Sequence, residues 1–112
     1  MFGFGPQVPQ VDAKDVLDAI TQKKDILILD VRTEGEVEKG KIKGSLHIPL
    51  DQLQSKAEKI LTDKEKTIYV YCLSGSRSAQ AASILSKMEY KNVSSMKSGL
   101  LSWRSNNYPL ES

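Results

Sequence analysis

The chain has 112 residues, 39% of them hydrophobic and 27% charged, which is the size and composition of one soluble globular domain. Sixteen basic residues against fourteen acidic ones leave a net charge of only +2, and the charges are interspersed, which argues against a nucleic-acid or membrane-binding surface. A single cysteine and a single histidine exclude an intrachain disulfide, a zinc site of four Cys/His ligands and a resolving thiol.

The ends of the chain suggest one domain preceded by a short tail. Residues 1–7 are expected to form a flexible N-terminal tail, and residues 8–112 a single domain. No apolar run approaches the ~20 residues that a membrane span needs. The N-terminus lacks the basic start and apolar core of a secretory signal, so we expect a cytoplasmic protein. A signal peptide removed earlier would instead place it in the periplasm.

The first half of the chain predicts a helix, a buried strand, a second short helix and a short strand. Asp12 can cap the first helix, which carries an apolar stripe. Residues 26–29 form a continuous apolar run, as expected of a parallel strand buried on both faces. Residues 33–36 have the spacing of a capping box, and residues 46–48 read as a strand that Pro49 ends.

The second half continues the alternation of strands and helices. Residues 53–61 carry apolar side chains at helical spacing, and residues 67–71 are β-branched and aromatic throughout. A helix with an apolar face at residues 81–88 and a weaker strand at residues 93–96 follow. A final helix around residues 100–103 is expected to stop near Pro109. Repeated strand–helix order favours right-handed crossovers and a mainly parallel sheet.

Cys72 lies at the position where proteins with an open α/β sheet usually have their active site. It directly follows the strand at residues 67–71, and ligand sites in open α/β sheets form at the carboxyl ends of strands. The amide groups of a tight loop entering a helix make an anion-binding concavity, Gly75 permits the positive φ of such a loop, and Arg77 adds a charge. This environment stabilises a thiolate, so Cys72 is predicted to be a nucleophile, against the alternative of a small buried apolar side chain.

The same residues carry a family resemblance that spans about residues 8–110. Three groups of motifs, in the same order and at similar spacing, resemble the rhodanese domain. The segments are Asp30-Val31-Arg32 with Glu36, Gly40-Lys41-Ile42-Lys43-Gly44-Ser45 and Ile48-Pro49; then Cys72 to Ala79; then Asn92-Val93, Gly99, Trp103 and Pro109. The chain departs from the family pattern at Lys41, a usual histidine position, and at Glu89 and Ser98, where glycines are common.

The resemblance implies an α/β fold with a five-stranded, mainly parallel sheet flanked by helices on both faces. It also implies a thiosulfate sulfurtransferase in which Cys72 accepts a sulfane sulfur as a persulfide and passes it on. The implied partners are a small anionic donor such as thiosulfate and an acceptor that is cyanide, a thiol or a thiol protein. No cofactor, metal, nucleic acid or membrane is implied, and we expect a monomer or a weak dimer.

The resemblance assigns roles by position. Cys72 is the persulfide site, and Asp30 and Arg32 are supporting scaffold residues. The residues that follow Cys72 are expected to bind the substrate, with Arg77 attracting the anionic donor. These residues are Leu73, Ser74, Gly75, Ser76, Arg77 and Ser78.

Two other functions stay open at this point. Phosphatases of related fold bind phosphate in a loop with five residues between cysteine and arginine, whereas four residues separate Cys72 from Arg77. One residue spans about 3.3–3.6 Å, so the shorter loop suits a single sulfur atom better than a tetrahedral oxyanion. The other alternative is a persulfide carrier, or a binding or sensing module, that serves one protein partner.

Overall fold

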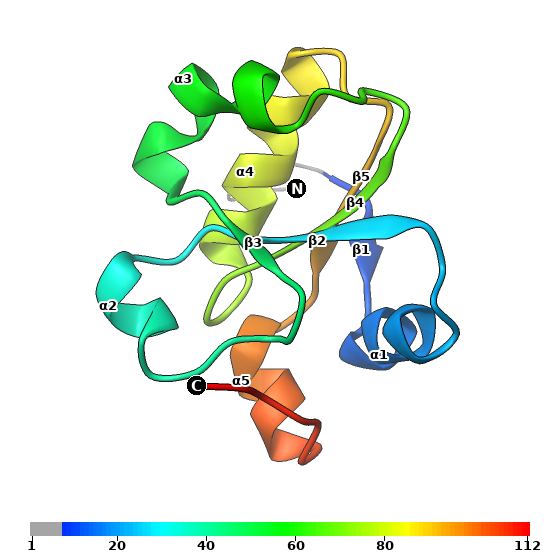
Figure 1. Cartoon of the computed structure of the whole chain (residues 1–112), viewed down its shortest axis with the longest axis vertical. Helices are drawn as coiled ribbons and strands as arrows, with labels where there is room; N and C mark the ends of the chain where they lie inside the picture. Colours follow the sequence, from blue (N-terminus) through cyan, green and yellow to red (C-terminus); the bar gives the residue numbers. More distant parts are fainter. Residues whose placement is uncertain (1–7) are drawn as a thin grey trace, which may run out of the picture.

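A single parallel sheet of five strands organises the chain in the computed structural model, which describes residues 8–112 (Figure 1). The predicted tail of residues 1–7 lies outside the described residues. The strands occur in the spatial order β1-β5-β4-β2-β3, and every pair is parallel. Their bounds are β1 Gln10–Val11, β2 Ile26–Asp30, β3 Leu46–His47, β4 Thr67–Tyr71 and β5 Asn92–Met96.

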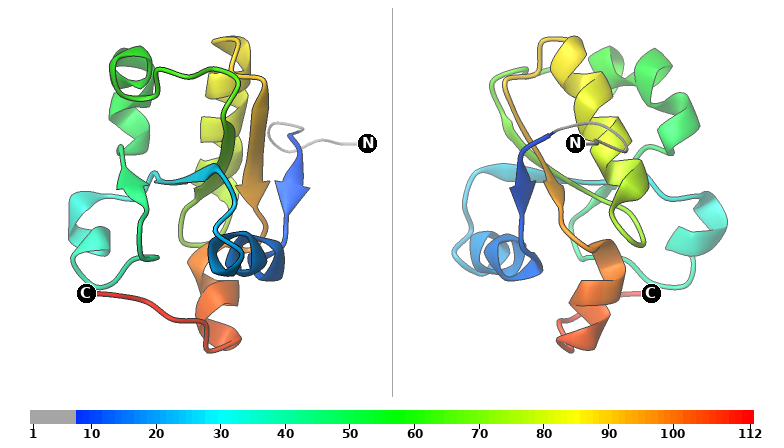
Figure 2. Two further views of the ribbon diagram at one scale, coloured as in Figure 1. Left: turned by 45° about the vertical axis from the view of Figure 1, so that its right-hand side comes forward. Right: turned by 180° about the vertical axis from the view of Figure 1, so that it is seen from behind.

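Helices cover both faces of this sheet (Figure 2). Helices α3 and α4 pack against one face around one apolar cluster, and α1 and α5 pack around a second cluster on the other face. The predicted fold class is therefore confirmed. The helix bounds are α1 Ala13–Thr21, α2 Glu34–Val37, α3 Leu50–Ile60, α4 Ser76–Lys87 and α5 Gly99–Ser105. No helix within residues 8–112 is long and apolar enough to cross a membrane.

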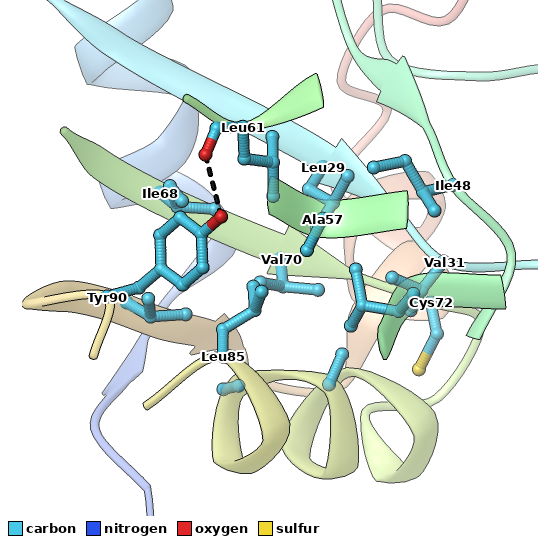
Figure 3. Packing of buried hydrophobic residues seen from close by; sticks show 14 residues of the cluster. Leu29, Val31, Ile48, Ala57, Leu61, Ile68, Val70, Cys72, Leu85 and Tyr90 are labelled. Atoms are coloured by element: carbon cyan, nitrogen blue, oxygen red, sulfur yellow. Dashed lines mark hydrogen bonds between the residues drawn. The ribbon is translucent and has the colours of Figure 1, made fainter. Parts of the chain in front are cut away.

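The central strand β4 determines the face on which Cys72 lies. Side chains alternate along a strand, so Ile68, Val70 and Cys72 enter the cluster beneath α3 and α4, while Tyr71 joins the opposite cluster. Figure 3 shows Cys72 at the end of the first cluster, beside Val31. Cys72 is thus both the last member of an apolar row and the first residue of the loop into α4.

Two elements differ from the sequence prediction. The two-residue strand β1 was not predicted, because Gln10–Val11 is too short for an alternating pattern and exists through its pairing with β5. The last helix ends at Ser105 and not near Pro109. The residue after the C-terminal end of α4 has the left-handed conformation that glycine usually adopts there, but in this chain it is Glu89, with φ 76°. The Tyr90 N–H donates to the Leu85 carbonyl and closes the end of the helix.

Candidate active site

The loop after β4 curls around the sulfur of Cys72. The Cys72 side chain is completely buried, and its Sγ accepts hydrogen bonds from the backbone N–H groups of Gly75 at 3.1 Å and Ser78 at 3.3 Å. Both donors lie at the N-terminal end of α4, where the helix dipole adds positive potential. The sulfur therefore sits where negative charge is favoured.

Two glycines make this tight loop feasible. Gly75 has φ 112°, a conformation that other residues rarely adopt. Gly99, at the start of α5, lies so close that a Cβ there would come within 2.6 Å of the Cys72 carbonyl oxygen and 2.5 Å of that of Leu73. The next two N–H groups, of Leu100 and Leu101, donate to these same carbonyls at 2.9 and 3.0 Å. The first turn of α5 thus holds the first two residues of the loop.

Two buried serine hydroxyls lie beneath the sulfur. Ser78 Oγ is 3.5 Å from Cys72 Sγ and donates to the Gly75 carbonyl at 3.1 Å. Ser95 Oγ, from the neighbouring strand β5, is 2.7 Å from Ser78 Oγ. Sequence reasoning included Ser78 but missed Ser95, because Ser95 belongs to a weak strand signal with no chemical motif around it. The pairing of β5 with β4 and the packing of α4 against β5 bring the two hydroxyls together.

Arg77 forms a bidentate ion pair with Glu36 of α2. The two guanidinium nitrogens lie 2.7 and 2.9 Å from the two carboxylate oxygens, and about 30% of each side chain is exposed. The hydrogen bonds from Arg77, aided by those from Thr33, lower the pKa of Glu36 to about 2. The same pair raises the pKa of Arg77. The positive charge of Arg77, which is expected to attract the donor, is therefore shared with the Glu36 carboxylate. The ion pair joins α2 to the first turn of α4.

Asp30 and Arg32 form a second ion pair, which is buried at the end of β2. Arg32 Nη2 lies 2.8 Å from Asp30 Oδ2 and also donates to the Gly40 carbonyl at 2.8 Å. Its guanidinium lies 5.5 Å from the centre of the Tyr71 ring. The pair thereby ties the segment after β2 to the strand that precedes Cys72, and neither side chain is hydrogen-bonded to the sulfur.

The remaining loop residues lie farther from the sulfur. Leu73 packs on the cluster of α1 and α5, and Ser74 and Ser76 are exposed. Beside Arg77, between the end of β2 and the start of α3, lies a hollow of about 320 Å³. It is lined by Val31, Arg32, Thr33, Pro49, Leu50, Asp51 and Arg77. Within residues 8–112, no three His, Cys, Asp or Glu side chains gather in a way that would hold a metal ion.

Comparisons with known proteins agree with this geometry. The model of the family described as "Rhodanese-like domain" matches residues 12–106. A sulfurtransferase from Allochromatium vinosum is 27% identical over 103 residues, 92% of this chain and 94% of that protein. Thiosulfate sulfurtransferase GlpE of Coxiella burnetii is 36% identical over 85 residues, 76% of this chain and 78% of that protein.

Solved structures show the same likeness in three dimensions. The solution NMR structure of the rhodanese-like domain of the Anabaena sp Alr3790 protein superposes with a TM-score of 0.85 at 30% identity. The match covers 94% of this chain and 80% of that one. The family model, the relatives and the fold lead to one conclusion: the chain belongs to the rhodanese-like sulfurtransferase family.

Proposed function

We propose that this protein transfers the sulfane sulfur of thiosulfate to a thiophilic acceptor through a persulfide on Cys72. The observation that carries the proposal is the position of Cys72 Sγ, which accepts two backbone N–H groups at 3.1 and 3.3 Å at the start of a twelve-residue helix. Such a site stabilises a thiolate without a basic side chain. The thiosulfate sulfurtransferase name of the GlpE relative supports the choice of donor.

The chemistry balances without a cofactor or a general base. The Cys72 thiolate attacks the outer sulfur of thiosulfate, an S–S bond forms, and the bond to the sulfonate sulfur breaks with its electron pair leaving on sulfite. The persulfide carries the negative charge that the thiolate had. Cyanide or a thiolate then attacks the outer sulfur, which leaves as thiocyanate or a new persulfide and restores the Cys72 thiolate.

The length of the loop argues against phosphatase chemistry. Four residues separate Cys72 from Arg77, one fewer than in the phosphatase loop, and the ion pair with Glu36 already engages two of the five N–H groups of the Arg77 guanidinium. The neutral backbone amides around Cys72 Sγ suit the single outer sulfur atom of a persulfide better than they suit a phosphate group. The hollow beside Arg77 offers room for the acceptor next to the loop.

Mass spectrometry followed by an acceptor assay tests the proposal. Thiosulfate treatment should add one sulfur atom to the protein, and cyanide should then release thiocyanate and restore the original mass. Cys72→Ser should abolish both steps, because the sequence has no second thiol. An unmodified protein at saturating thiosulfate would refute the proposal.

The same assay separates a turnover enzyme from a carrier. A persulfide that forms on Cys72 but is discharged by neither cyanide nor small thiols would show that a protein partner is the acceptor. Ser86→Ala is a matched control, because Ser86 has an exposed side chain on α4, outside the loop that is expected to bind the substrate. Its activity should equal that of the unmodified sequence.

A further inference from the structure

The hydroxyl of Ser95 is completely buried and is hydrogen-bonded to the hydroxyl of Ser78. Within residues 8–112 its only hydrogen-bond partner is Ser78 Oγ, at 2.7 Å, and both side chains are fully buried. Serine is not a common choice for a buried position on a strand, since its hydroxyl must find a partner there. Ser95 faces α4 and the sulfur site, whereas the adjacent Ser94 lies on the opposite face of β5.

The direction of the hydrogen bonds follows from counting protons. Ser78 has one proton and can accept two hydrogen bonds. If Ser78 donated its proton to Ser95, the Ser95 proton would have no acceptor within the described structure. Ser95 therefore donates to Ser78, and the Ser78 proton is left for the Gly75 carbonyl at 3.1 Å. In this state the Cys72 thiol donates to Ser78 Oγ at 3.5 Å.

Loss of the thiol proton changes this arrangement. The thiolate no longer donates to Ser78, and it becomes the strongest acceptor within reach of the Ser78 hydroxyl. A rotation about the Cβ–Oγ bond of Ser78 turns the proton from the Gly75 carbonyl to Cys72 Sγ. The sulfur then receives three hydrogen bonds: from the Gly75 N–H, the Ser78 N–H and the Ser78 hydroxyl.

We propose that Ser95 is a positioning residue that orients the Ser78 hydroxyl to donate to Cys72 Sγ whenever that sulfur carries the negative charge. The Ser95 hydroxyl occupies one lone pair of Ser78 Oγ and polarises its O–H bond, which strengthens the donor. No proton is transferred within the pair; only the Ser78 O–H rotates.

The same hydrogen bond acts in both halves of the proposed sulfur transfer, and this part of the inference rests on the proposed function. In the first half the pair raises the fraction of Cys72 present as thiolate. In the second half Cys72 Sγ is the leaving group when the acceptor removes the outer sulfur. A donor that stabilises the departing thiolate makes that S–S bond easier to break.

The charged groups around the loop cannot replace this donor. Arg77 of α4 is paired with Glu36 of α2, and Asp30 at the end of β2 is paired with Arg32. Charged side chains on or next to the other elements around the loop, which are α3, β5 and α5, are exposed. They include Asp51 on α3, Lys97 after β5 and Arg104 on α5.

Titration of Cys72 in the intact protein tests the inference directly. Because the sequence has one cysteine, incorporation of carbon-13-labelled cysteine yields one NMR signal whose position reports the thiol–thiolate equilibrium. We expect Ser78→Ala to raise the titration midpoint by about one pH unit, as for loss of a hydrogen bond to an ionised group. Ser95→Ala should raise it by about half a unit, roughly a threefold change in the equilibrium constant.

The double variant distinguishes positioning from a merely structural effect. If Ser95 acts through Ser78, adding Ser95→Ala to Ser78→Ala should move the midpoint no further. Ser94→Ala is the matched control and should leave it unchanged. A Ser95→Ala midpoint equal to that of the unmodified sequence, or the same shift with and without Ser78, would overturn the inference. The titration needs no sulfur donor, so its outcome is independent of whether thiosulfate is the substrate.

Discussion

Replacing Glu36 with glutamine should show how much the ion pair with Arg77 contributes to stability. Glutamine keeps an oxygen that can accept the hydrogen bond from Thr33 N–H, which lies 3.0 Å from Glu36 Oε1, so the cap of α2 survives while the charge is lost. A pKa lowered from 4.5 to about 2 corresponds to at most about 3 kcal/mol of stabilisation. Because about 30% of each partner is exposed, solvent screening reduces the expected loss to about 1–2 kcal/mol at neutral pH.

The pH dependence of this loss has a definite sign. A carboxyl group whose pKa is lowered by folding contributes its full stability above pH 4.5, and the contribution disappears as the pH falls through about 2. Urea unfolding at a series of pH values should therefore show the largest gap between Glu36→Gln and the unmodified sequence near neutral pH. The gap should shrink below pH 4.5.

The same substitution should also change the use of an anionic donor. Arg77 without its carboxylate partner presents an uncompensated charge beside the loop, so the KM for thiosulfate should fall severalfold. Glu34→Gln, on the same short helix but exposed, is the control for both measurements. A stability gap that does not vary with pH, or one that Glu34→Gln reproduces, would refute the assignment of the pKa shift to the ion pair.

Three further substitutions test the framework of the site by urea unfolding at neutral pH. Gly99→Ala should cost about 2–4 kcal/mol and abolish sulfur uptake, because the added Cβ would collide with the Cys72 and Leu73 carbonyl oxygens. Asp30→Asn should cost about 3 kcal/mol, since it leaves the buried Arg32 guanidinium without a counter-charge. Glu89→Gly should instead stabilise the protein by about 0.5–1 kcal/mol, because it relieves a positive φ at the end of α4.

Each of these variants has a control of the same type. Gly35→Ala should be neutral or slightly stabilising, because no atom lies within 4 Å of its added Cβ. Asp18→Asn, which breaks an exposed pair with Lys14, should change stability by less than about 0.5 kcal/mol. Lys87→Gly, within the last turn of α4, should destabilise, because glycine is a poor helix former. Equal effects in a variant and its control would contradict the structural reason given for that variant.

Local patterns in the sequence were sufficient to predict most of the secondary structure. The strand at Thr67–Tyr71 was predicted with its observed bounds, because a β-branched and aromatic run is a property of five neighbouring residues. The capping box of α2 is likewise local, since Thr33 and Glu36 are one helical turn apart. The place of Cys72 at the carboxyl end of a strand followed directly from that strand assignment.

Contacts between distant segments could not be read in this way. Glu36 and Arg77 are 41 residues apart, and Ser78 and Ser95 are 17 apart. Whether such pairs meet depends on strand order, register and crossover length, which no single segment encodes. The sequence by itself therefore determined the candidate nucleophile, its loop and the parallel α/β architecture. Tertiary structure alone decided that a carboxylate neutralises Arg77 and that a second hydroxyl lies beneath the sulfur.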